Sequence, residues 1–504
     1  MSTTLPDRLP YATTPLARKD AWVRQAAYVA IALLFLALVY QFHRGTIKQI
    51  RKAAEAQAAG VTEGVKQHKG AIGRWRFDVQ QFWKGQNIYL APLPPGQEVD
   101  RPNDAWQAKH PNMPVVVMML TPFYALSPPM TALAWNVLKL AALVAMVLMT
   151  VAVVNHDDRR MPDWAALLAF LAAANFLVAD FQHGNTNVFV AAAVVGHCYA
   201  WRRGHDLLAG VILALAICLK LTPALFVLYW LWQREWKLLA STLVALPALI
   251  LSPALLTGWS FYADAMDTWW GSMVAPGLTG GQWYPASINQ SIAGMVARYF
   301  LGGDNGNFLW APDDEPVPSA FAWITVIDLG PRWAKRLLQA LQAIVVLASL
   351  WAIGLRRLPR DDGRRALHYG LIVAMIMLLN QRTWDHHAAP LILAYFAIAY
   401  AAWGANATRT WRRRIGYTLL VACALTLVSG DDPMKLLVGE HGSDRASAYG
   451  TTFWHFLAVW ILGVIATRKL RDRLDPYESS AAQDPAAEAA SPSGAVFAAS
   501  TSTT

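Results

Sequence analysis

Long apolar segments separated by short basic loops dominate this chain. Hydrophobic residues make up 55% of the 504 residues and charged residues only 15%. The apolar residues are gathered into many segments of roughly 15–22, close to the about 20 residues that a membrane-spanning helix needs. The sequence therefore predicts an all-α polytopic membrane protein. A transmembrane β-barrel is excluded because runs such as 141–154 show no alternation of apolar and polar residues.

We predict a bundle of about twelve transmembrane helices with exterior loops. Segments such as 206–219 are shorter than the roughly 17 residues of a full crossing, which is tolerated where a helix lines a cavity. The proline-broken segment 114–127 is interpreted as a re-entrant or partial span. The predicted spans are approximately 23–42, 130–154, 163–180, 186–201, 206–219, 222–233, 237–256, 336–355, 366–380, 388–404, 415–430 and 451–467.

The loops with the most Lys and Arg set the expected orientation. Basic clusters at 202–203, 356–365 and 412–414 alternate along the chain with loops richer in Asp, Gly, Trp and Tyr. By the positive-inside rule the basic loops face the cytoplasm, and an even number of spans places both termini there. The run that begins near Val23 is interpreted as an uncleaved signal anchor.

This topology divides the chain into three parts. Residues 1–22 form a cytoplasmic tail, and residues 23–470 form the transmembrane domain. Within that domain, 43–113 is the first exterior loop, opening with an Ala-rich helix interpreted as a spacer. Residues 471–504 form a cytoplasmic tail that is rich in Ala, Ser and Pro and is expected to be disordered. The expected location is the cytoplasmic (inner) membrane, with the active site facing the exterior or periplasm.

Several function classes are not supported. The three cysteines lie inside apolar runs and are interpreted as buried hydrophobes. The net charge of +10 comes from span-end loops, which indicates topology and not nucleic-acid binding. No phosphate-binding loop, dinucleotide fingerprint or zinc-type spacing is present, so no cofactor and no metal are predicted.

Costly polar residues cluster on the expected exterior side, in short turns between apolar runs. Lys220 must find an anionic partner there or, alternatively, extend its ammonium to the interface. Pro223 can start the next helix, whose amides would help to hold a phosphate. The turn 182–187 and Asp78 each also have a purely structural interpretation, as turn chemistry and as a surface carboxylate. The polar set is Asp78, Gln182, Asn185, Lys220, Asn289, Arg298, Arg382, His386 and His387.

Six motifs in order resemble glycosyltransferase family 87, within the GT-C superfamily that uses polyprenyl-phosphate sugars. The resemblance covers roughly residues 70–405. The matching elements are Asp78 with Gly85-Gln86-Asn87-Ile88-Tyr89, the segment from Pro111 to Pro122, Gln182-His183-Gly184-Asn185, the block from Ala209 through Lys220-Leu221-Thr222-Pro223, Asn289-Gln290-Ser291, and Thr383-Trp384-Asp385-His386-His387.

The resemblance implies transfer of a hexose, most often mannose, from a polyprenyl-phosphate donor to a hydroxyl of a lipid or glycan at the outer face. A lipid-phosphate leaving group can be held by cations and helix N-termini, and one carboxylate suffices as base for an inverting displacement. The expected partners are this donor, the acceptor and membrane lipids, without nucleic acid. The expected roles are catalytic for Asp78 and His386, donor-phosphate binding for Lys220, Arg382, His387 and Arg298, and substrate binding for Gln182, Asn185, Asn289 and Trp384.

Two rival functions are weighed beside this one. A ligase that moves whole polyprenyl-linked glycans would share the exterior basic pocket. A secondary transporter would have a site near the middle of the membrane, formed by paired halves with corresponding broken helices. The sequence shows no second-half counterpart of Lys220, which favours a transferase over a transporter.

Overall fold

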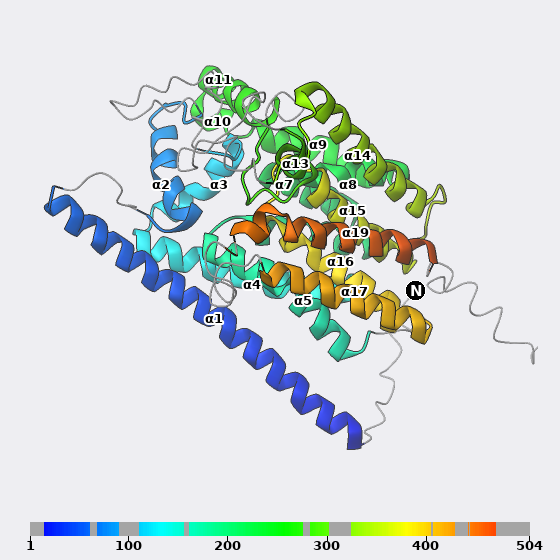
Figure 1. Cartoon of the computed structure of the whole chain (residues 1–504). Helices are drawn as coiled ribbons and strands as arrows, with labels where there is room; N and C mark the ends of the chain where they lie inside the picture. Colours follow the sequence, from blue (N-terminus) through cyan, green and yellow to red (C-terminus); the bar gives the residue numbers. More distant parts are fainter. Residues whose placement is uncertain are drawn as a thin grey trace, which may run out of the picture.

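The computed structural model is helical throughout its described part. It describes residues 15–60, 68–89, 110–155, 161–275, 283–301, 324–404, 407–428, 442 and 444–469. In these residues there is no β-strand (Figure 1). The elements are α1 (Pro15–Ala58), α2 (Gly70–Phe82), α3 (Pro114–Tyr124), α4 (Pro128–Val154), α5 (Asp163–His183), α6 (Asn187–Arg202), α7 (Asp206–Leu219), η2 (Thr222–Ala224), α8 (Leu225–Trp232), α9 (Trp236–Leu251), α10 (Ala254–Thr257), α11 (Trp259–Trp269), η3 (Trp270–Val274), α13 (Ile292–Phe300), α14 (Gly330–Ile353), α15 (Arg364–Leu379), η5 (Asp385–Leu391), α16 (Ile392–Ala399), η6 (Tyr400–Gly404), α17 (Arg409–Val428) and α19 (Thr451–Lys469).

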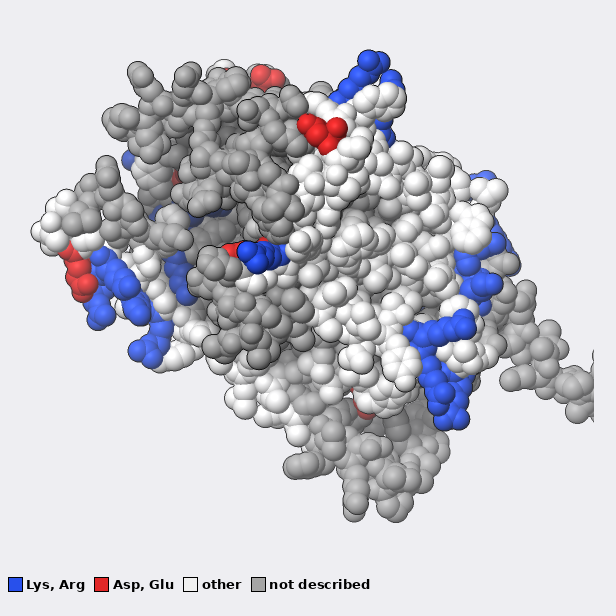
Figure 2. Space-filling model, in the orientation of Figure 1, with Lys and Arg blue, Asp and Glu red and all other residues white. Residues whose placement is uncertain are grey.

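The predicted all-α polytopic membrane fold is confirmed. Each of the twelve predicted spans coincides with helix, and seven helical segments of the described chain are long and apolar enough to cross a membrane. Helices α15 and α16 are almost fully buried, because their neighbours α5, α14 and α19 surround them. On the space-filling surface, Lys and Arg lie mainly toward the ends of the bundle and leave an uncharged belt between them (Figure 2). That distribution suits a bundle whose middle is in contact with lipid.

Helix α1 does not end where the sequence analysis placed the end of the first span. It runs without a break through residue 42 and continues to Ala58. The Ala-rich helix expected at the start of the first exterior loop is present as far as Ala58, and it is continuous with the first span. Ala, Lys, Gln and Arg dominate these residues, and all are strong helix formers, so nothing in them interrupts the helix that begins in the membrane.

Helices α2 and α3 cap one end of the bundle (Figure 1). Helix α3 has only 11 residues and contains Pro122, so it is too short to cross, as predicted for 114–127. Tyr124 donates a hydrogen bond from its hydroxyl to the carbonyl of Ile72 over 2.8 Å, which ties α3 to α2. Residues 1–14 of the expected tail 1–22, the whole expected tail 471–504, and residues 61–67 and 90–109 of the loop 43–113 lie outside the described residues.

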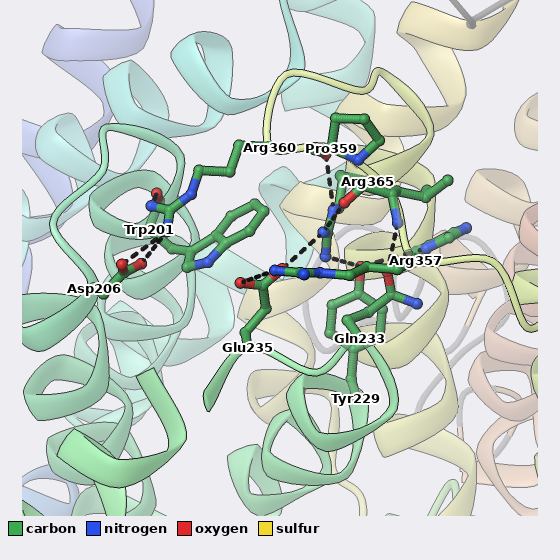
Figure 3. Close-up of polar contacts among 11 residues, drawn as sticks. Trp201, Asp206, Tyr229, Gln233, Glu235, Arg357, Pro359, Arg360 and Arg365 are labelled. Atoms are coloured by element: carbon green, nitrogen blue, oxygen red, sulfur yellow. Dashed lines mark hydrogen bonds and ion pairs between the residues drawn. The ribbon is translucent and has the colours of Figure 1, made fainter. Parts of the chain in front are cut away.

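At the opposite end a polar network ties three loops together (Figure 3). Arg365 Nη2 donates to Glu235 Oε1 over 3.1 Å and Nη1 donates to the Tyr229 hydroxyl over 3.3 Å. Arg360 pairs with Asp206 at 2.6 Å, and both guanidinium groups lie over the ring of Trp201. The network joins the α6–α7 turn, the α8–α9 turn and the α14–α15 loop, so the basic loops of this end form one rigid surface.

We predict that Arg365→Ala destabilises the protein strongly, because it leaves the buried Glu235 without its main partner. Removing one member of a buried ion pair costs about 3–5 kcal/mol. Arg357 contacts the same carboxylate at 3.5 Å, but its side chain is 58% exposed, so Arg357→Ala should cost less than about 1 kcal/mol. Apparent melting temperatures in detergent test this pair. Equal losses in the two variants would contradict the assignment.

Candidate active site

Three turns converge at the end of the bundle opposite the Arg365 network. They are the α5–α6 turn, the α7–η2 turn and the α15–η5 loop, and η5 packs against both α5 and α6. The α5–α6 turn is set by Gly184, which has a φ of 62°. A Cβ at that position would lie 2.8 Å from Cζ of Phe42, so only glycine fits against α1 here.

Lys220 lies between α7 and η2 and faces a small cavity. Its Nζ donates to Asn187 Oδ1 over 2.9 Å. The cavity is lined by Asn187, Val190, Val194, Lys220, Thr222, Pro223, Val373, Ile376, Met377, Asn380, His387 and Pro390. No carboxylate is among the described lining residues, so the ammonium faces amides, an imidazole and apolar side chains. This arrangement favours an anionic ligand over a cationic one.

Burial lowers the pKa of Lys220 to about 7, while the nearby carboxylate of Asp180 opposes the shift. Desolvation disfavours the charged ammonium because no anion contacts it directly. The side chain therefore changes charge within the physiological pH range. A phosphate placed in the cavity would stabilise the ammonium.

Asp180 organises the residues behind Lys220. Its Oδ2 lies 3.0 Å from Lys139 Nζ, and both side chains are fully buried. Its Oδ1 accepts from Asn187 Nδ2 over 3.0 Å. The result is a hydrogen-bonded series from Lys139 through Asp180 and Asn187 to Lys220. The sequence analysis missed Lys139 and Asp180 although each is a charged residue inside an apolar span, which is a recognised functional signal.

The two adjacent histidines face different surroundings. Asn185 Nδ2 donates to His386 Nε2 over 3.2 Å, and the ring of His386 lies 4.6 Å from that of His183. His387 instead lines the Lys220 cavity, stacks on the Trp384 ring at 5.6 Å, and accepts at Nδ1 from the backbone N–H of Trp384 over 3.3 Å. The structure thus brings His386, His387, Lys220 and Asn185 together at these turns.

Asn289 supports the α15–η5 loop. It accepts at Oδ1 from the backbone N–H of Thr383 over 3.0 Å and donates through Nδ2 to the carbonyl of Gln381 over 3.0 Å. Its side chain is fully buried, and both polar groups of its amide form hydrogen bonds with protein atoms. Asn289 therefore holds in place the loop that carries two other predicted site residues, Arg382 and Trp384.

The Arg298 side chain also directs its polar groups at other protein atoms. Its guanidinium donates to the carbonyls of Pro285, Ala286, Asn289 and Ala448 over 2.8–3.1 Å and lies 2.9 Å from Met295 Sδ. Burial lowers its pKa to about 10. With its N–H groups directed at protein acceptors, Arg298 secures the segment that carries Asn289. For this reason the proposed function does not include the predicted contact between Arg298 and the donor phosphate.

The remaining predicted site residues differ in the exposure and the contacts of their polar groups. Arg382 lies with its guanidinium 5.1 Å from the centre of the Tyr284 ring, and burial lowers its pKa to about 10. The indole N–H of Trp384 is buried and has no hydrogen-bond partner in the described chain, so it can donate to a ligand oxygen. Gln182 is exposed at the end of α5.

Asp78 lies in α2 beside a residue that the sequence analysis missed. Its Oδ2 is 3.6 Å from His110 Nδ1, and both side chains are buried. Neither atom has a hydrogen-bond partner among the described residues. The Trp75 ring contacts the imidazole edge-on at 5.6 Å, and burial lowers the pKa of His110 while Asp78 raises it. His110 lies in a polar loop without any local signal, so only the fold reveals the pair.

The Asp78 pair and the Lys220 cavity belong to the same end of the molecule. The backbone N–H of Ile72 in α2 donates to the carbonyl of Gly184 over 3.3 Å. One hydrophobic cluster contains Trp75 and Val79 beside Asp78 together with Cys218, two residues before Lys220. The described residues hold no group of three or more His, Cys, Asp or Glu side chains suited to a metal ion.

The chain matches the family model of glycosyltransferase family 87 over residues 112–381. It belongs to this family. The predicted resemblance is therefore confirmed, and so is the prediction of a membrane glycosyltransferase. The matched region contains the α5–α6 turn, Lys220 and Asn289, but it begins after Asp78 and ends before Arg382. The roles of Asp78, His386 and the other site residues remain predictions.

Two similar proteins are named as mannosyltransferases. A protein of Mycolicibacterium smegmatis (strain ATCC 700084 / mc(2)155) is 26% identical over 382 residues, which cover 71% of this chain and 76% of the relative. A protein of Mycobacterium tuberculosis (strain ATCC 25618 / H37Rv) is 23% identical over 377 residues, covering 71% and 77%. Each is named a polyprenol-phosphate-mannose-dependent alpha-(1-2)-phosphatidylinositol mannoside mannosyltransferase. No solved structure matches this chain.

The lowered pKa of His110 predicts a specific acid sensitivity. Because burial lowers the pKa of His110 in the folded protein, the unfolded chain binds a proton first as the pH falls below about 6.5, and stability is lost in that direction. We expect His110→Gln to make the fall in apparent melting temperature between about pH 7 and pH 5 less steep. His205→Gln, at an exposed histidine, is the control. An unchanged slope in His110→Gln would show that folding does not lower the pKa of this histidine.

Proposed function

We propose that this chain transfers mannose from a polyprenyl-phosphate mannose to a hydroxyl group of a glycolipid acceptor related to the phosphatidylinositol mannosides. The family and the names of the two relatives support the donor and the acceptor class. The single observation that carries the proposal is the cavity at Lys220, which offers a partly buried ammonium to an anion and has no described carboxylate in its lining.

The donor phosphate would lie in the Lys220 cavity. Lys220 supplies charge, and Thr222 and Pro223 of η2 line the cavity beside it. His387 lines the cavity and can donate a hydrogen bond to a phosphate oxygen. As the glycosidic bond to phosphate breaks, these groups stabilise the negative charge that accumulates on the leaving group. His386, held by Asn185, lies beside them and can orient or protonate the same leaving group.

The acceptor would approach from the side of α2. In a single inverting displacement, a carboxylate removes the proton of the acceptor hydroxyl while the oxygen attacks the anomeric carbon. Asp78 suits this role, because its Oδ2 is buried and has no hydrogen-bond partner among the described residues. His110, 3.6 Å away, can orient that carboxylate and stabilise the proton it takes up. Arg382 and the indole N–H of Trp384 are suited to the hydroxyls of the sugars.

We place this site at the outer face of the cytoplasmic membrane. The basic loops tied by Arg365, Arg360 and Asp206 lie at the other end of the bundle, which the positive-inside rule assigns to the cytoplasm. A ligase for whole glycans would need the same phosphate cavity and differs only in the acceptor it admits. A transporter is disfavoured because the polar groups gather at one end of the bundle and not at its middle.

Asp78→Asn should abolish transfer while leaving donor binding intact. Loss of a general base costs about 10²–10⁴ in rate. Transfer is measured with radiolabelled polyprenyl-phosphate mannose and a lipid acceptor in detergent, and donor binding is measured separately. Asp267→Asn removes an exposed carboxylate from α11 at the same end and should be fully active. Near-normal turnover in Asp78→Asn would sink the assignment of the base.

Lys220 should make donor binding depend on pH. Its ammonium is present below pH 7 and is lost as the pH rises through its pKa of about 7, so the wild-type affinity for the donor should fall between about pH 6 and pH 8.5. Lys220→Met should bind the donor about ten- to hundredfold more weakly at pH 6, without that pH dependence. Lys220→Arg keeps its charge and should bind equally at both values. Normal donor affinity in Lys220→Met would place the phosphate elsewhere.

A further inference from the structure

Helix α1 is much longer than a membrane crossing requires. At about 1.5 Å per residue its 44 residues extend roughly 66 Å, while the hydrocarbon core is about 30 Å thick. Its C-terminal end projects past α2 and α4, and the whole helix runs obliquely across the bundle (Figure 1). A large part of α1 therefore lies outside the hydrocarbon, although it is continuous with the part inside.

The exposed face of α1 changes from apolar to basic within one turn. From Tyr28 to Tyr40 the large exposed side chains are Tyr28, Val29, Leu33, Leu34, Leu36 and Tyr40. From residue 44 onward they include Arg44, Lys48, Arg51 and Lys52. These four positions are three or four residues apart, so they lie on one face. We call them the α1 basic face. Figure 2 shows basic side chains along this projecting end.

The change in chemistry coincides with a membrane boundary. The Arg44 guanidinium lies 5.7 Å from the centre of the Tyr40 ring, and tyrosines are enriched where hydrocarbon meets headgroups. The headgroup layer is about 5–8 Å thick on each side of the core. Arg44 and Lys48 lie within about 6 Å of rise of one another, so both fall inside that layer, and the long side chains of Arg51 and Lys52 reach back to it.

The protein itself does little to neutralise these cations. The one ion pair on the α1 basic face is the exposed Arg51–Glu55 contact at 3.5 Å, and the described chain offers Arg44, Lys48 and Lys52 no acidic partner. The basic residues at the other end of the bundle differ, because Arg360 and Arg365 are bound to carboxylates. On the orientation proposed above, the positive-inside rule does not explain an exterior basic face either.

We propose that the α1 basic face binds the phosphate groups of anionic phospholipids in the surrounding bilayer. Phosphodiesters occupy the layer in which these side chains lie, and their charge complements four cations that share one carboxylate, that of Glu55, within the described chain. Phe42, half a turn before Arg44, packs against Gly70 and Gly184. The lipid contact would therefore hold the outer end of α1 beside the turn that carries the candidate active site.

The test compares lipid binding in the wild type with R44Q/K48Q/R51Q. Delipidated full-length protein in detergent is titrated with dioctanoyl-phosphatidylglycerol or dioctanoyl-phosphatidylcholine, and bound lipid is counted by native mass spectrometry. Each basic residue near an anionic surface strengthens binding about fivefold, so the triple variant should bind phosphatidylglycerol on the order of a hundredfold more weakly. Binding of phosphatidylcholine should not change.

One control variant and one alternative variant complete the test. R332Q/R336Q/R413Q removes three exposed charges elsewhere and should retain the preference for phosphatidylglycerol. If the first triple variant fails to fold, K48Q/K52Q removes two exposed charges that make no ion pair in the described chain and should lose about twenty-fivefold. An unchanged preference in the α1 variants would overturn the proposal. Competition by millimolar inorganic phosphate would overturn it too, because it would indicate a site for free phosphate.

Discussion

The buried carboxylate of Asp180 is the interaction on which the candidate site depends. It lies in α5 among apolar helices, where an unpaired charge would be very costly, and it is stabilised by Lys139 at 3.0 Å and by amides of the following helix. Those amides belong to Asn187 and Val188, so the charge fixes the start of α6. Asn187 in turn accepts the hydrogen bond of Lys220. One buried ion pair thus sets the position of the ammonium that faces the cavity.

The polar residues of the protein divide into two groups by how fully they are bonded. Asn289 and Arg298 direct their donors at backbone carbonyls, and Arg365 is bound to Glu235 and Tyr229. These residues hold loops in place at the two ends of the bundle. Lys220, Trp384 and Asp78 are different, because each keeps a buried or partly buried polar group that atoms of the described residues satisfy only partly or not at all. Buried groups of that kind favour a ligand, since a ligand can supply the missing partner.

The types and order of residues along the chain predicted the positions of the helices and the family. The lengths of the apolar runs predicted a helix at every proposed span, and the motif order indicated family 87, which its family model confirms. His386 and His387 were both predicted as site residues, and the structure brings both to the candidate site, where they contact different surroundings. The apolar run did not reveal that α1 continues unbroken into the loop, because hydropathy marks where apolar residues stop, whereas a helix continues as long as its residues favour one.

The helical membrane architecture and the family follow from the amino-acid sequence alone, because both depend on local patterns of apolar length and motif order. The partners of the polar residues were decided only by the tertiary structure. His110 meets Asp78 across 32 residues, and Lys220 meets Asn187 across 33. Such contacts depend on how helices pack, and a residue's neighbours in the chain do not encode them. For the same reason the sequence ranked Arg298 with Lys220, although packing occupies the first with protein carbonyls and leaves the second facing a cavity.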